Sequence, residues 1–199
     1  MRPLHAGIWS GLCVIVVFAV LPAAADSDGV LPAVWKEQHL QLTYLGRTSR
    51  YSCDGLRDKV RALLIELGAR RDMKIVAAGC AELGEHLHPG RFMPNVHVVF
   101  SSPALPDTAK PQHAGDLSAV DARFEAFAIT SDAFRNMDIG DCELVEDFAR
   151  QILPKLAVRD LREDIACVPY EESGSRYLIR GRILRALPRA AQPRAAQPR

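Results

Sequence analysis

The sequence predicts an α+β fold made of two repeated β-α-β-β units, whose helices pack on one face of a mixed sheet, with one disulfide per unit. Three observations predict it. Two stretches that begin with cysteine resemble each other, alternating apolar and polar residues flank each of them, and an even number of cysteines follows residue 25. We expect the first unit over 26–101, a Pro-containing linker over 102–119 and the second unit over 120–187.

The internal similarity joins residues 53–70 to residues 142–159, which align without a gap. The alignment matches Asp58 with Asp147, Arg61 with Arg150, Leu64 with Leu153, Leu67 with Leu156 and Arg70 with Arg159. Each stretch leads through a short apolar segment to a second cysteine, Cys80 or Cys167. Two amphipathic helices can resemble each other by chance, but cysteines matching at both ends favour an internal duplication.

Each aligned stretch has the apolar spacing of an amphipathic helix. The two stripes are Leu56, Val60, Leu63, Leu64 and Leu67, and Val145, Ala149, Ile152, Leu153 and Leu156. We expect Ser52 and Asp141 to cap the helix starts and Gly68 to end the first helix. Pro154 should kink or end the last turn of the second helix.

Strands are expected on both sides of each helix, where residues alternate in polarity or are β-branched. The predicted strands are 38–45, 74–78 and 95–101 in the first unit, and 124–130, 164–168 and 177–187 in the second. A β-α-β connection implies a right-handed crossover between parallel strands, and the next strand is added by a hairpin.

The cysteine pairing follows from the lengths of these elements. A helix of about 15 residues spans about 22 Å, and a returning strand of about 7 residues spans about 23 Å. The strand therefore ends level with the start of the helix, which favours Cys53–Cys80 and Cys142–Cys167. Pairings that link the two units also respect the symmetry, and they remain the alternatives.

The first 25 residues have the pattern of a secretory signal peptide. Arg2 is followed by an apolar run over 8–21 and by small residues over 23–25, where we expect cleavage. The run is shorter than the roughly 20 residues that span a membrane. The sequence thus predicts export, to the periplasm or beyond the cell, and a mature chain that does not span a membrane.

The charge balance argues against a nucleic-acid partner. Of the 25 basic and 24 acidic residues in the chain, Arg2 is the one that cleavage after residue 25 would remove. The mature chain then carries equal numbers of each. A nucleic-acid-binding protein instead shows a strong basic excess.

Candidate chemistry is sparse. His86, His88 and His97 follow Cys80 with ligand-like spacing, but a Cys80 held in a disulfide does not bind zinc or copper. Nucleophile-elbow, P-loop and dinucleotide-binding motifs are absent from the sequence. The acidic residues Asp138, Asp141, Glu143 and Glu146 are interpreted as cap and dipole partners of a helix start. The sequence therefore predicts no catalytic residue, no metal site and no cofactor.

The C-terminal segment 188–199 repeats Pro-Arg-Ala-Ala-Gln and has little to bury. We expect it to be disordered. It is interpreted as a dispensable tail, or alternatively as a basic arm for an anionic envelope component.

The cysteine-centred motifs resemble those of a group of uncharacterised exported proteobacterial proteins. The resemblance rests on Tyr51–Arg61 with Gly79-Cys80, and on Gly140–Glu146, and it extends over roughly residues 35–187. It implies a location in a Gram-negative envelope, and it supplies no activity or catalytic residue.

The expected function is that of a non-enzymatic periplasmic or secreted binding or structural module. Its partner would be an envelope protein or an anionic envelope component. Two alternatives stay open: an enzyme with its active site between the two halves, and a metal carrier using His86, His88 and His97.

Overall fold

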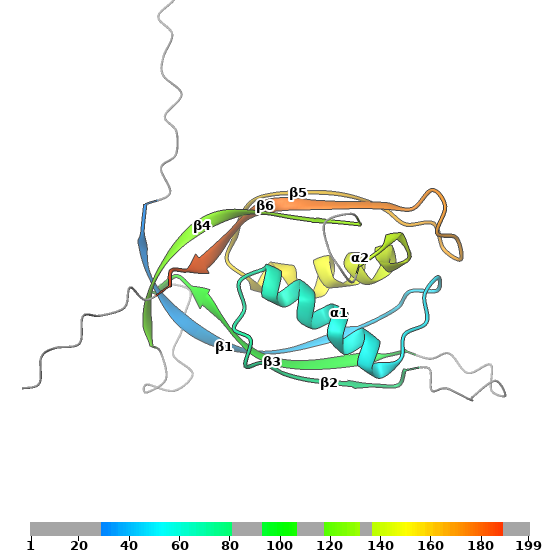
Figure 1. The fold of residues 1–199 in the computed structure, drawn as a ribbon, viewed down its shortest axis with the longest axis horizontal. Coiled ribbons are helices and arrows are strands. Elements are labelled where there is room, and N and C mark those ends of the chain that lie inside the picture. The colour runs from blue at the N-terminus through cyan, green and yellow to red at the C-terminus, as the bar shows by residue number, and fades with distance from the viewer. Residues whose placement is uncertain (1–28, 81–92, 107–117, 132–136, 189–199) are drawn as a thin grey trace, which may run out of the picture.

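The computed structural model describes residues 29–80, 93–106, 118–131 and 137–188 (Figure 1). In chain order the elements are β1 (Leu31–Thr43), α1 (Cys53–Glu66), β2 (Lys74–Ala78), β3 (Asn95–Ala104), β4 (Ala119–Thr130), η2 (Ile139–Asp141), α2 (Cys142–Gln151), η3 (Leu153–Lys155), β5 (Val158–Ala166) and β6 (Arg176–Ala186). The fold is therefore α+β, as the sequence predicts. Residues 1–25, the predicted signal peptide, and the tail beyond residue 188 lie outside the described residues.

All six strands belong to one sheet in the order β2-β3-β1-β4-β6-β5. Every neighbouring pair is antiparallel, so the prediction of a mixed sheet is wrong. The physical reason is that β3 lies between β1 and β2, and β6 lies between β4 and β5. Strands that flank a helix in sequence do run parallel, but a hairpin strand separates them.

The middle of the sheet is held by a short contact between β1 and β4. The two strands pair only through residues 31–34 and 119–122, whereas β1 pairs with β3 through residues 34–43. Beyond residue 34 the two parts of the sheet diverge, and Figure 1 shows α1 and α2 lying between them. We call the β1–β4 contact the joint and the opposite side, where β1 ends, the open end.

The main core fills the space between the two parts of the sheet. Its largest fully buried side chains come from both helices and from strands of both parts, and include Phe148, Leu42, Leu56, Leu63, Ile129, Ile179 and Ile183. Burying such a side chain stabilises the fold by about 1.5–3 kcal/mol. The helical stripes expected from the sequence therefore form one shared core, which holds the two parts of the sheet together.

The ends of the helices follow their local chemistry. The Ser52 side chain accepts a hydrogen bond from the Gly55 amide, and Gly68 follows α1 with φ of 81°. Only glycine adopts that left-handed backbone without strain. Pro154 falls where α2 has given way to the 3-10 turn η3, in line with the expected effect of proline. Asp141 occupies the N-cap position of α2, as predicted, but its side chain makes no capping bond to that helix. It accepts instead from the Asp138 amide at the start of η2.

Several strands are longer than the sequence predicts. β1 begins at Leu31 and β5 at Val158, and β3 continues into the predicted linker as far as Ala104. Pro103 is tolerated in β3 because β2 pairs with β3 only as far as Val99. At Pro103 the strand thus has a described partner strand on one side only, and a missing amide donor on the other costs little.

Both disulfides join the pairs favoured by geometry. Cys53 bonds to Cys80 and Cys142 to Cys167, with Cα–Cα distances of 5.2 and 5.6 Å. Each links the start of a helix to the end of a strand at one edge of the sheet. The predicted pairing is confirmed, and each bond ties an edge strand to the core.

Removing either disulfide should destabilise the protein. The bonds close loops with sequence separations of 27 and 25. We expect Cys53→Ala/Cys80→Ala to lower the unfolding free energy by about 3.5 kcal/mol in the chain-entropy account. Urea unfolding measures the loss, and Cys142→Ala/Cys167→Ala serves as the matched variant with a similar expected loss. Recovery of a Cys53–Cys142 peptide from a non-reducing digest would contradict the assignment.

Candidate functional site

Two polar features stand out in the described part of the chain, one at the open end and one near the joint. At the open end, side chains of α2 hold the segment that follows β1. Near the joint, a pocket is lined by residues of both halves. The open-end feature holds the two halves in place.

The first feature is a ladder between α2 side chains and the backbone of residues 43–48, which we call the clasp. Gln151 bonds both backbone groups of Thr43, accepting from its amide at 2.9 Å and donating to its carbonyl at 2.8 Å. One helical turn earlier, Asp147 accepts from the Leu45 amide at 2.7 Å. The side chains of α2 thus provide the hydrogen bonds that another strand would otherwise provide to this segment.

Glu143 completes the clasp. Its Oε2 accepts from the amides of Arg47 and Thr48 at 2.6 and 2.7 Å. The geometry fits because four helix residues rise about 6 Å and two extended residues rise about 6.6 Å. Side chains at i, i+4 and i+8 of α2 therefore stay level with alternate residues of the segment.

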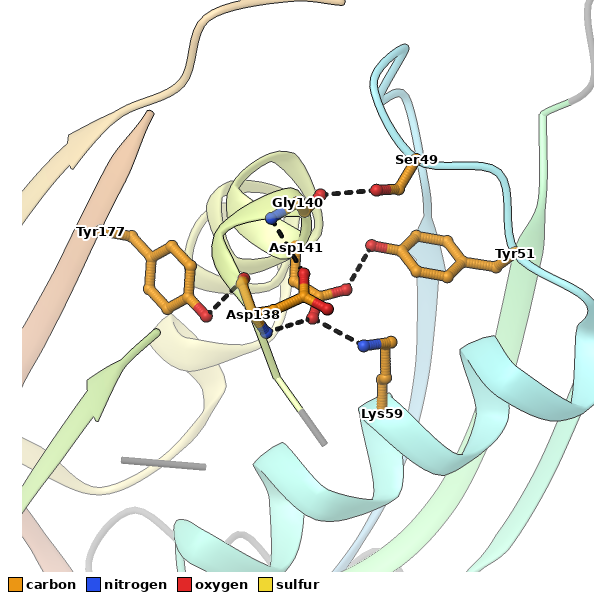
Figure 2. Close-up of polar contacts among 7 residues, drawn as sticks. All are labelled: Ser49, Tyr51, Lys59, Asp138, Gly140, Asp141 and Tyr177. Carbon is orange, nitrogen blue, oxygen red and sulfur yellow. Dashed lines mark hydrogen bonds and ion pairs between the residues drawn. The ribbon is translucent and has the colours of Figure 1, made fainter. Parts of the chain in front are cut away.

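A second set of contacts surrounds Asp141, which is 1 % exposed (Figure 2). Its carboxylate accepts from the Tyr51 hydroxyl and the Lys59 ammonium, each at 2.6 Å, and from the Asp138 amide at 2.8 Å. Three donors satisfy a buried charge that would otherwise be costly. Asp141 thereby joins α1 and the segment after β1 to the start of α2. We call this the Asp141 node.

Neighbouring contacts fix the turn that carries Asp141. The Asp138 side chain accepts from the Gly140 amide, and the Ser49 hydroxyl donates to the Gly140 carbonyl at 2.7 Å. The Tyr177 hydroxyl, from β6, donates to the Asp138 carbonyl at 2.9 Å (Figure 2). Strand and loop residues from both halves therefore converge on this turn.

Burial affects the acid–base behaviour of three groups here. Burial raises the pKa of Tyr44 and of Tyr51, with contributions from the Glu143 charge for Tyr44 and from Asp141 for Tyr51. Both phenols stay protonated and act as donors. Burial also raises the pKa of Asp147, although the Leu45 amide and Arg150 oppose the shift. All three side chains are buried, and each makes hydrogen bonds to another part of the chain.

The interpretation of Asp138, Asp141, Glu143 and Glu146 as cap and dipole partners is only partly confirmed. The Asp138 side chain caps η2 and Glu143 lies in the first turn of α2, but the hydrogen bonds of the buried acids also serve another role. Asp141, Glu143 and Asp147 are buried, at 1, 9 and 2 % exposed, and none of the bonds found for them caps α2. The sequence feature that could have indicated their role is the i, i+4, i+8 spacing of Glu143, Asp147 and Gln151, which places the three side chains on one helix face. At the aligned position of the other helix, the Asp58 side chain is 61 % exposed and lies near Arg57.

The second feature is a pocket of about 290 Å³ near the joint. Its lining residues are Lys36, Gln38, Pro103, Ala104, Leu105, Phe124, Pro154, Lys155, Leu156, Ala157, Val158 and Arg159. Those numbered below 106 come from β1 and the end of β3, and the others from β4 and the η3–β5 connection. The pocket therefore requires both halves of the chain.

The pocket has an apolar body and a positive charge. Phe124 is buried beneath it, and the Arg159 guanidinium lies over the Phe124 ring at 4.0 Å from the centroid. Gln38 is also buried and donates to the Ser102 hydroxyl at 2.8 Å. Lys36, Lys155 and Arg159 give three cations, and the lining includes no Asp, Glu or His among the described residues.

The residues singled out from the sequence are not brought together at either feature. His97 lies exposed on β3, whereas His86 and His88 lie outside the described residues. Over the ranges that the structure describes, no three His, Cys, Asp or Glu side chains are grouped to hold a metal ion. The described cysteines, Cys53, Cys80, Cys142 and Cys167, are all in disulfides.

The fold and these two features define an α+β protein whose halves, each with a disulfide, share one sheet. No protein-family model, no curated protein and no solved structure matches the chain. The two disulfides fit an oxidising, extracellular compartment. Of the helices that are described, none has the length and apolar content needed to cross a membrane.

The Asp141 node should contribute strongly to stability. Asp141→Asn removes the buried carboxylate charge that accepts from Lys59 at 2.6 Å. We expect a loss of roughly 3 kcal/mol, as for other broken buried pairs, measured by urea unfolding. Asp164→Asn is the control, because its pair with Arg176 is exposed on both sides and should contribute less than about 1 kcal/mol. Equal effects of the two variants would contradict the role given to Asp141.

The pH dependence of stability should carry a contribution from Asp147. Its pKa is raised in the folded state above the value of 3.8, so the folded protein holds the proton more tightly than the unfolded chain. The stability of the wild type relative to Asp147→Asn is then greatest below about pH 3.8 and falls as the pH rises through the folded-state pKa. Urea unfolding of both proteins between about pH 3 and pH 7 tests this. If the stability of the wild type relative to Asp147→Asn increased with rising pH, the prediction would be contradicted.

Proposed function

We propose that this chain is an exported, non-enzymatic binding protein that takes a small ligand in the pocket near the joint. The observation that carries the proposal is that both halves contribute to one pocket with an apolar body and converging polar groups. Pockets of this composition are the usual place for small ligands. The clasp and the node at the open end support the proposal by keeping the halves in a fixed arrangement.

The lining of the pocket favours binding over catalysis. An enzyme between the halves would need groups that exchange protons near neutral pH, such as His or a tuned carboxylate. The described lining offers Lys, Arg and Gln instead. The buried carboxylates of the chain are engaged by backbone amides, Tyr51 and Lys59 at the open end.

We also propose that the two halves arose by duplication and that both helices cover the same face of the sheet. The strand order supports a duplication: β2-β3-β1 in the first half corresponds to β5-β6-β4 in the second. In each half the disulfide joins the start of the helix to the end of the outermost strand. The shared core of α1 and α2 supports a common face.

The export part of the proposal is supported by the signal-peptide pattern over 1–25 and by the disulfides. An oxidising compartment keeps such bonds intact. The resemblance to exported proteobacterial proteins agrees with a periplasmic location. We give no role to His86, His88 and His97, because His86 and His88 lie outside the described residues.

The binding role predicts that the protein keeps a ligand through purification from its native compartment. Native mass spectrometry of the oxidised protein should find a bound small molecule, which denaturation releases. Ala157→Trp should abolish the adduct, because the indole fills the pocket from a lining residue in the connection before β5. Ala78→Trp at an exposed position of β2, away from the pocket, is the matched control. Retention of the adduct by Ala157→Trp would contradict the assignment of the pocket.

A further inference from the structure

We infer that the ligand of the pocket is a small organic anion with an apolar body, such as an alkyl carboxylate or an alkyl phosphate. This inference rests on the proposed binding function and adds the chemical class of the ligand. It is argued from three observations: the charges around the pocket, the contacts that hold one of them, and the apolar surface beneath them.

The charged residues in the described lining of the pocket are all of one sign. Lys36, Lys155 and Arg159 line it, and none of the three forms an ion pair with another described residue. Like charges that share a pocket repel one another unless an anion lies between them. An anionic ligand would relieve that repulsion, and the positive charge of the pocket would attract it from solution.

The nearest acidic residue on β1 does not neutralise this charge. Glu37 lies between Lys36 and Gln38 in sequence, and successive side chains of a strand point to opposite faces. The Glu37 carboxylate is 65 % exposed and lies 2.8 Å from His39. Lys36 and Gln38 line the pocket on the other face, so the charge on β1 that faces the pocket is positive.

Arg159 is held in a position suited to an anion. Its guanidinium lies 4.0 Å from the centroid of the Phe124 ring, and Phe124 is buried. Stacking against an aromatic face restricts the plane of the guanidinium and leaves its N–H donors at the edge. Those donors match the two oxygens of a carboxylate or phosphate.

The remaining lining selects for an apolar body. Pro103, Ala104, Leu105, Leu156 and Val158 surround the same space as Phe124. The pocket volume of about 290 Å³ is at the lower end of the range for ligand sites, roughly 300–1,000 Å³. The structure therefore favours a compact amphiphile over inorganic phosphate alone or a large lipid held entirely inside.

The test uses the oxidised mature protein, delipidated, with defined probes in isothermal titration calorimetry at low salt. Octanoate and octyl phosphate should bind with one site per chain. Inorganic phosphate should bind at least tenfold more weakly than octyl phosphate, and octylamine should not bind in the pocket. A titration with salt should weaken the binding of both anions.

Variants assign the binding to these residues. Lys36→Gln/Arg159→Gln should weaken octanoate binding at least tenfold, and Lys155→Glu should weaken it at least as much, because it reverses an exposed charge with little risk to folding. Lys74→Gln, which removes a charge from β2 outside the pocket, is the control and should bind as the wild type does. Circular dichroism verifies that every variant folds.

The source of the anion is distinguished by vesicles of phosphatidylglycerol, with phosphatidylcholine as the control. Pocket-dependent binding to the former points to a membrane lipid, whereas binding of the free octyl anions alone points to a soluble amphiphile. Octylamine binding as tightly as octanoate, or no octyl anion binding at all, would overturn the inference. If octylamine or another small molecule still occupies the pocket, the proposed function survives that result. If no probe binds and no ligand co-purifies, both the inferred ligand class and the proposed binding function are wrong.

Discussion

The structure depends on the hydrogen-bond partners of the backbone after β1, where β4 no longer pairs with this part of the chain. Backbone amides that leave a sheet must be paired elsewhere. Here three side chains on one face of α2, namely Glu143, Asp147 and Gln151, bind the backbone of residues 43–48. A helix of the second half thereby substitutes for a strand beside the first half. The contact is specific, because a shift of one residue on either side would bring the wrong groups together.

This clasp, the joint and the disulfides act at different places and support one arrangement. The joint connects the two parts of the sheet through only a few residues, so it alone would allow them to move relative to each other. The clasp and the Asp141 node hold them at the opposite end, and each disulfide holds an edge strand. A pocket that takes its walls from both halves needs this fixed spacing, since preorganised sites bind at lower cost.

The sequence predicts much of the fold, and its failures have physical reasons. Periodicity predicts the helices and most strands, and the lengths of the helix and the returning strand predict that Cys53 lies next to Cys80. The sheet was predicted as mixed because adjacency in sequence does not reveal that β3 inserts between β1 and β2. The sequence analysis interpreted Glu143 as a dipole partner and gave Asp147 no binding role, because their backbone partners lie about one hundred residues earlier, at Arg47 and Leu45. The sequence analysis left open a site between the halves but could not identify its lining, since Lys36 and Arg159 come to line one pocket only through the tertiary fold.

The central claim is that carboxylates of α2 bind the amides after β1, and amide hydrogen exchange measures this directly. Nuclear magnetic resonance on the native oxidised protein at neutral pH would follow the Leu45, Arg47 and Thr48 amides. Our account predicts that all three exchange slowly, as amides within the sheet do, although Leu45 is 53 % exposed. Exchange at the rate of an unstructured loop at these three positions would contradict it.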